Sequence, residues 1–227
     1  MLFSAGGPDF LRGVGFFFMA KIVFFVDGFN LYHALDYTET SPNHQKYQKY
    51  KWLNLSALAG LFVGPLDSLE QVILFTAFVT WDQAKVARHK LFVRANEAMG
   101  VSVVYGEFKR KDKYCRLCRR EYQSFEEKQT DVNIALELFR LAFLDKYDRA
   151  VIISGDTDLI PAIKAVRATF PQKQIGVIIP IGKSSVDLLK HADFRFKMKE
   201  QHLASSRFPN RLSLPGGATV DCPPNWR

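Results

Sequence analysis

The chain has 227 residues, of which 48% are apolar and 24% charged, and its formal net charge is +8. This length fits one large domain or one domain with an appendage, and the composition excludes a largely disordered protein. Three cysteines are too few for a disulfide framework, so we expect a reducing, cytoplasmic setting. No run of 18 apolar residues occurs, which argues against a membrane partner. The positive charge is compatible with a polyanion such as RNA.

Residues 1–18 come before the first buried-strand pattern, and we expect them to form a poorly ordered leader. A signal peptide has a basic start, whereas here Asp9 precedes Arg12, the first basic residue. The apolar residues 22–26 also run directly into Asp27, so cleavage nearby would damage a core strand. We therefore expect one domain over residues 19–200.

Short apolar runs alternate with segments of helical spacing along this domain. Strands are expected at residues 21–26, 71–79, 101–105, 149–154, 174–181 and, at an edge, 194–199. Helices are expected at residues 54–62, 82–99, 130–144, 156–170 and 185–191. In the third helix we expect Thr130 to be the N-cap, with Leu136 and Phe139 among the residues packed inward.

This alternation predicts an α/β fold, with a doubly wound, mostly parallel sheet of five to six strands and helices on both faces. Two segments fall outside the pattern. Residues 109–125 are basic, contain Cys115 and Cys118, and are expected to form an inserted hairpin or loop. Residues 201–227 are rich in proline, serine and glycine and are expected to form an extended or disordered tail.

Acidic side chains gather where the predicted strands end. Asp27 ends the first strand, and Asp156 and Asp158 follow the strand at 149–154. Ligands of such sheets bind at the carboxyl ends of the strands. If these two strands are neighbours, Asp27 and Asp156 face one crevice, which Asp131 can reach from the first turn of its helix.

Clustered carboxylates repel one another, so they are protonated or they hold a cation. Oxygen ligands favour Mg²⁺ or Mn²⁺, which can activate water and stabilise charge on a phosphoryl group. A competing interpretation applies to each aspartate taken alone, because an aspartate at a helix N-terminus is often only a cap.

The segments 25–30, 127–132 and 154–159 resemble, in order and spacing, the three motifs of the NYN/LabA-like domain family, which belongs to the PIN-like nuclease superfamily. The resemblance covers residues 21–199. It implies a PIN-like fold and a ribonuclease-type site in which Asp27, Asp131 and Asp156 hold the metal. Asp158 would support that site, Asn30 would orient substrate or water, and Lys128 would face phosphate.

Three functions follow from this reading. The first is metal-dependent hydrolysis of RNA. The second is NADH-dependent hydroxylation of a pyridine-type molecule, because some chains with this domain are described as such hydroxylases. The sequence has no G-x-G-x-x-G motif after a strand to support dinucleotide binding. The third is a catalytically silent module that binds nucleic acid.

The segment 109–125 carries two further features. Its basic residues, with interleaved tyrosines, suit phosphate steering and base stacking, although a solvated charged loop remains the alternative. The residues that we expect to bind nucleic acid are Lys109, Arg110, Lys111, Arg116, Arg119 and Arg120. Cys115 and Cys118 are half of a tetrahedral zinc site, so we do not expect zinc within one chain. A zinc ion shared across a homodimer and two plain thiols stay open.

Overall fold

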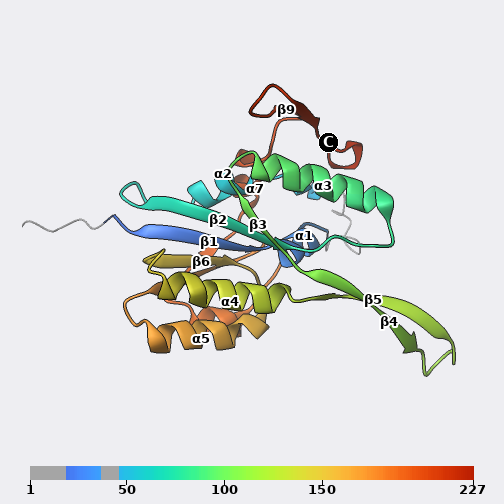
Figure 1. Ribbon diagram of the computed structural model, residues 1–227, viewed down its shortest axis with the longest axis horizontal. Helices are drawn as coiled ribbons and strands as arrows, with labels where there is room; N and C mark the ends of the chain where they lie inside the picture. The colour runs from blue at the N-terminus through green and yellow to red at the C-terminus, as the bar shows by residue number, and fades with distance from the viewer. Residues whose placement is uncertain (1–18, 37–45) are drawn as a thin grey trace, which may run out of the picture.

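The computed structural model describes residues 19–36 and 46–227; the expected leader lies outside them. Six parallel strands form one sheet in the order β3-β2-β1-β6-β7-β8 (Figure 1). The strands are β1 (Lys21–Asp27), β2 (Ser68–Thr76), β3 (Ser102–Tyr105), β6 (Arg149–Ile153), β7 (Gln174–Ile179) and β8 (Phe194–Lys197). The predicted doubly wound α/β fold is confirmed.

Helices cover both faces of the sheet. They are α1 (Gly28–Asp36), α2 (Leu55–Gly60), α3 (Gln83–Glu97), α4 (Thr130–Phe143), α5 (Ile160–Thr169), α6 (Val186–His191) and α7 (Glu200–Ser205). Short 3₁₀ turns are η3 (Gln48–Lys51), η4 (Thr157–Leu159) and η5 (Pro224–Trp226). In Figure 1, α4 and α5 lie on one side of the sheet and α2, α3 and α7 on the other. No helix in the described ranges is long and apolar enough to cross a bilayer.

The side chains of β1 are buried on both faces, as expected for a central parallel strand. Phe24 and Val26 pack in a core with α1 and α2, while Val23 and Phe25 pack in a second core with α4 and α5. Asp27 has the same parity as Phe25, so the strand directs its carboxylate to the α4 side of the sheet.

Helix α4 differs from its prediction in two respects. Gln129 is the N-cap in the left-handed region, and Thr130 is the first helical residue; the Glu127 carboxylate accepts a bond from the Thr130 amide instead. Leu136 is 65% exposed and Phe139 is partly exposed. Leu136 lies about 200° around the helix from buried Ile134, so only one of them can face the core.

The inserted segment is an antiparallel hairpin of β4 (Glu107–Tyr114) and β5 (Glu121–Lys128). It extends away from the body of the molecule between β3 and α4 (Figure 1). Pairing is continuous over eight residues on each strand. Opposite residues of such a ladder share a face, so the lysines of β4 lie on one face, with Glu126, and Phe108 and Phe125 lie on the other.

The expectation of an extended or disordered tail is wrong. The segment contains α7, the hairpin of β9 (Arg211–Ser213) and β10 (Thr219–Asp221), and η5. Phe208 and Trp226 pack with fully buried Trp52, whose Nε1 donates to the Pro209 carbonyl at 2.9 Å. Proline and glycine mark turns here, and the apolar residues between them supply enough burial to order the chain.

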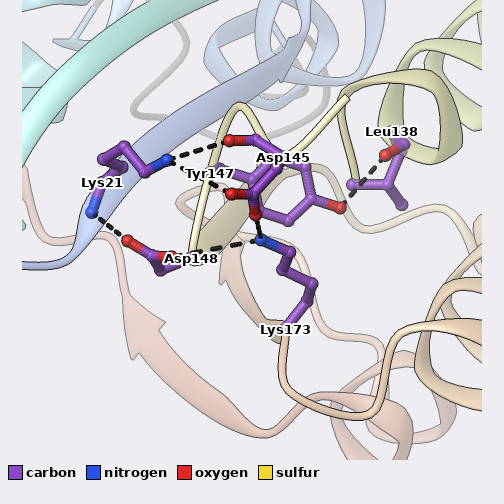
Figure 2. Close-up of polar contacts among 6 residues, drawn as sticks. All are labelled: Lys21, Leu138, Asp145, Tyr147, Asp148 and Lys173. Atoms are coloured by element: carbon purple, nitrogen blue, oxygen red, sulfur yellow. Dashed lines mark hydrogen bonds and ion pairs between the residues drawn. The ribbon is translucent and has the colours of Figure 1, made fainter. Parts of the chain in front are cut away.

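Pairs of oppositely charged side chains lie at the amino ends of β1, β6 and β7 (Figure 2). The Lys173 ammonium is almost fully buried, pairs with Asp145 and lies 4.0 Å from Asp148. The Asp148 carboxylate accepts from the Lys21 amide at 2.8 Å, and the Lys21 ammonium donates to the Asp145 carbonyl at 2.9 Å. Tyr147 lies beneath Lys173 and donates to the Leu138 carbonyl at 3.0 Å. Opposite charges thus join three loops at this edge.

Candidate metal centre

Asp27 lies at the carboxyl end of β1, next to β6, as the sequence predicts. Its Oδ1 accepts from the Asn30 amide at 2.9 Å and its Oδ2 from the Ser154 hydroxyl at 2.8 Å. The side chain is buried, and burial raises the pKa of Asp27 to about 6 against the lowering effect of both hydrogen bonds. The residue after Asp27 has to be a glycine, as Gly28 is, because a Cβ there would lie 2.8 Å from the Phe75 carbonyl oxygen.

The loop after β6 is tied to the same site. The Ser154 hydroxyl that donates to Asp27 also accepts from the Asp156 amide at 3.0 Å. The Asn30 side-chain oxygen accepts from the Gly155 amide at 3.0 Å. The carboxylate of Asp156 accepts from the Asp158 amide at 2.9 Å. The Asn30 side-chain oxygen therefore joins α1 to this loop. That Asn30 also orients substrate or water stays a prediction.

Asp131 enters from the first turn of α4. Burial and repulsion from Asp156, Glu127 and Asp158 raise the pKa of Asp131 to about 6. Asp131 and Asp156 likewise raise the pKa of Asp27. The three predicted carboxylates are therefore close enough to repel one another at one end of the sheet. Glu127 is an addition to the predicted set, and its position in the motif 127–132 was the available signal.

A divalent cation suits the chemistry of these donors, because carboxylates with raised pKa values gain from a nearby positive charge. Within residues 19–36 and 46–227, however, no three His, Cys, Asp or Glu side chains converge tightly enough to hold a metal as they stand. Both oxygens of Asp27 already accept protein hydrogen bonds. The residue types thus fit Mg²⁺ or Mn²⁺, and binding requires small side-chain movements.

Most of the expected nucleic-acid contacts are on the hairpin, and several are already paired. Lys128 and Lys111 share the Glu126 carboxylate at 3.2 and 2.6 Å, together with Lys113 at 2.9 Å. These lysines lower the pKa of Glu126 to about 2. Lys109 pairs with Glu107, and Arg110 lies 3.4 Å from Asp112. Lys128 therefore pairs with Glu126, and its contact with phosphate stays a prediction.

Arg116, Arg119 and Arg120 lie in the turn of the hairpin, between β4 and β5. All three are exposed. The described part of the chain offers no acidic partner for them in this turn. They are the cations of the predicted set that remain available to a polyanion.

A pocket of about 430 Å³ lies on the other side of β1, between α1, the end of β2, α3 and the hairpin. Trp81 stacks on Phe125 with ring centroids 3.9 Å apart and meets Phe108 edge-on at 5.1 Å. His89 also lines the pocket; its Nε2 lies 3.0 Å from Thr76 Oγ1, and burial lowers the pKa of His89 to about 4. The sequence analysis missed this pocket, because its walls come from segments that lie far apart in the sequence.

Arg88 is the cation of this pocket with no hydrogen bond or ion pair to the described residues. Lys51, which lines the opposite wall, pairs with Asp36 and lies over the Tyr32 ring at 4.2 Å. Aromatic and aliphatic side chains therefore make up most of the lining, with one guanidinium available for an anionic group. Such a lining suits a planar ring that carries a negative charge.

A parallel α/β sheet with an acidic site where β1 and β6 end defines the class of this protein. The NYN domain model matches residues 21–198, which is most of the chain. The chain therefore belongs to the NYN domain family, as its three motifs indicate.

Two relatives extend this result. The chain is 35% identical to 6-hydroxy-3-succinoylpyridine 3-monooxygenase HspA of Pseudomonas putida over 122 residues, which are 51% of this chain and 38% of that protein. The match thus spans well under half of that relative. A crystal structure of a protein of unknown function from Vibrio parahaemolyticus has a TM-score of 0.56 at 17% identity, covering 80% of this chain and 94% of that one. At this identity the likeness shows the fold alone.

Proposed function

We propose that this protein hydrolyses phosphodiester bonds of RNA with Mg²⁺ or Mn²⁺ at Asp27, Asp131 and Asp156. The observation that carries the proposal is the mutual repulsion of these carboxylates at the carboxyl edge of the sheet. A protein gains nothing in stability from gathering like charges, so the arrangement is best explained by a cation that binds there.

The chain's own residues hold this site in place. Two hydrogen bonds orient the Asp27 carboxylate, and each of its oxygens retains a lone pair for a ligand. Asn30 fixes the loop that carries Asp156, and the Asp158 amide orients the Asp156 carboxylate. The bound cation would supply the Lewis acidity that activates water and offsets charge on the phosphoryl group.

RNA is the proposed substrate because the unpaired cations of the predicted set lie at the tip of the hairpin whose base adjoins this edge. The hairpin leads directly into α4, which carries Asp131. The arginines of its turn can attract phosphates, and its exposed Tyr114 and Tyr122 can stack on bases. With a net charge of +8, we expect binding to weaken as salt increases.

The test is cleavage of a labelled single-stranded RNA in Mn²⁺, with EDTA as a control. Asp156→Asn should lower the rate by about 100-fold or more, since a lost electrostatic group at a reacting centre has an effect of this size. The asparagine oxygen can still accept from the Asp158 amide, so the fold should persist. Asp187→Asn is the matched control, because Asp187 is exposed and pairs with Lys190 away from the site.

Equal cleavage by Asp156→Asn and wild type would show that Asp156 is only a cap. Salt-sensitive binding without cleavage in any metal would show a silent nucleic-acid-binding module. Cleavage that EDTA does not affect would remove the metal from the proposal.

A second candidate function is NADH-dependent hydroxylation of a pyridine-type molecule. The aromatic pocket with Arg88 favours it, together with the printed name of the Pseudomonas putida relative. In this reaction one oxygen atom of O₂ enters the ring, the other leaves as water, and NADH supplies two electrons. NADH oxidation should then depend on a pyridine carboxylate and fall in Arg88→Ala, while Asp156→Asn behaves as wild type. No substrate-dependent NADH oxidation would exclude this function.

A further inference from the structure

The turn of the β4–β5 hairpin has the geometry of a metal-binding knuckle. The Cys115 amide donates to the Arg120 carbonyl at 2.9 Å, and the Arg119 amide donates back to the Cys115 carbonyl at 2.8 Å. Arg119 has φ 55°, a left-handed conformation that is uncommon for an arginine and that closes this turn. The turn therefore holds Cys115 and Cys118 on one short, defined loop.

The two sulfur atoms point toward each other in this turn. The backbone amides of Leu117 and Cys118 donate to the Cys115 sulfur, and the Cys118 side chain is also hydrogen-bonded to it. These bonds lower the pKa of the Cys115 thiol. Amide donors that stabilise a thiolate prepare it as a metal ligand, since the thiolate and not the thiol binds zinc.

The described chain supplies only two ligands, whereas a structural zinc ion takes four. Cys222, the third cysteine, is 1% exposed and packs in the core of Trp52 and Trp226. No third His, Cys, Asp or Glu joins the pair within the described ranges. The residues that the structure describes therefore fill only two of the four ligand positions.

The position of the turn suits a contact between two chains. The hairpin extends away from the body, so its tip is accessible (Figure 1). Cys118 is exposed, and Leu117 between the cysteines is 97% exposed, so the described chain does not cover either side of the turn.

Charge argues that a metal is needed for this contact. Arg116, Arg119 and Arg120 surround the cysteines, so two tips brought together would place six arginines in close proximity. Four thiolates around one Zn²⁺ carry a net charge of −2, which offsets part of this repulsion. Without the metal, nothing at the tip would offset the repulsion among these arginines except the acids farther along the hairpin, such as Glu121.

We propose that Cys115 and Cys118 form half of a tetrahedral zinc site that a second copy of this chain completes, tip to tip. Each of the four thiols loses one proton, so binding of one Zn²⁺ releases four protons and changes no oxidation state. The resulting dimer would hold two acidic sites at the bases of two joined hairpins.

The test is the metal content and mass of the full chain in reducing buffer with added Zn²⁺. We expect one zinc ion per two chains and twice the mass of 25.9 kDa by light scattering. Replacing Zn²⁺ with Co²⁺ should give the absorption bands of a tetrahedral cobalt thiolate. Cys115→Ser with Cys118→Ser should remove the metal and give monomers, and its thermal melt should match that of wild type in EDTA, because the tip is exposed.

Cys222→Ala is the matched control, since it removes the buried thiol and should keep both zinc and dimer. One zinc per monomer would overturn the proposal in favour of a site within one chain. A dimer that persists in the double serine variant would place the interface elsewhere. A protein without zinc, or with a Cys115–Cys118 disulfide under these conditions, would also overturn it.

Discussion

The two edges of the central sheet handle charge in opposite ways. At the amino edge, each charged group shown in Figure 2 has an opposite partner: Lys173 with Asp145 and Asp148, and Lys21 with Asp145. At the carboxyl edge, the charged groups that shift the pKa values of Asp27 and Asp131 are all acids. The same strands connect both edges, so the difference lies in the loops.

This contrast separates a structural arrangement from a functional one. Pairing a buried charge offsets the cost of removing it from water. Gathering like charges lowers stability and is retained where a site needs it. The amino edge should therefore respond to mutation through stability, and the carboxyl edge through ligand binding and activity.

The largest expected effect on stability is at the amino edge. Lys173→Met keeps the side-chain length but removes the ammonium between Asp145 and Asp148. We expect the free energy of unfolding to fall by about 2–3 kcal/mol, less than for a fully buried pair because the acids retain contact with water. Denaturant unfolding measures this change.

Lys190→Met is the matched control and should change stability by under about 0.5 kcal/mol, because its pair with Asp187 is exposed. Equal effects would remove the distinction between buried and surface pairs.

The next effect concerns a cation at the carboxyl edge. Mn²⁺ at ten times its dissociation constant should stabilise the protein by about 1.4 kcal/mol, since it binds only the folded chain. A thermal melt at pH 7.5 should rise by several degrees, and Asp156→Asn should remove this rise. If both proteins respond alike, Mn²⁺ does not bind at these carboxylates.

The smallest effect is a gain of stability at the carboxyl edge. The pKa of Asp131 is raised to about 6 in the folded protein. Protonation of Asp131 therefore favours the folded protein over the unfolded chain. The contribution of Asp131 to stability is fully present below pH 4 and is lost as the pH rises through 6. Asp131→Asn should therefore be more stable than wild type by about 1 kcal/mol at pH 7.5, after allowance for solvent screening, and equal to it near pH 3.5. Urea unfolding at both pH values tests this; a loss of stability at pH 7.5 would mean that Asp131 has a favourable structural partner.

Much of the fold could be predicted from local patterns. All six strands of the central sheet lie where apolar runs predict them, because buried parallel strands are continuously apolar. The hairpin was identified by its basic composition, and the acids by their position after strands. Helix α1 escaped prediction because it starts directly at the site motif, with Gly28 and Asn30 in its first turn.

The wrong or missing predictions share one cause, which is that they depend on contacts between residues far apart in the sequence. Trp52 is fully buried by the C-terminal segment, which the sequence analysis expected to be extended or disordered. Its partners lie more than 150 residues away, so no local pattern could show them. The pocket around Trp81 was missed for the same reason. The pairing of Lys111 and Lys128 with Glu126 depends on strand register, which composition does not reveal.

Trp226 connects this C-terminal segment to the chemistry of the molecule. It packs against Trp52 in the third core and also lines the aromatic pocket. The family model ends at residue 198, so Trp226 lines the pocket from outside the matched NYN region. Relatives that share the acidic motifs can therefore differ in this wall without altering the sheet. Substitutions in the C-terminal segment can therefore change the shape of the pocket while the residues of the acidic site stay the same.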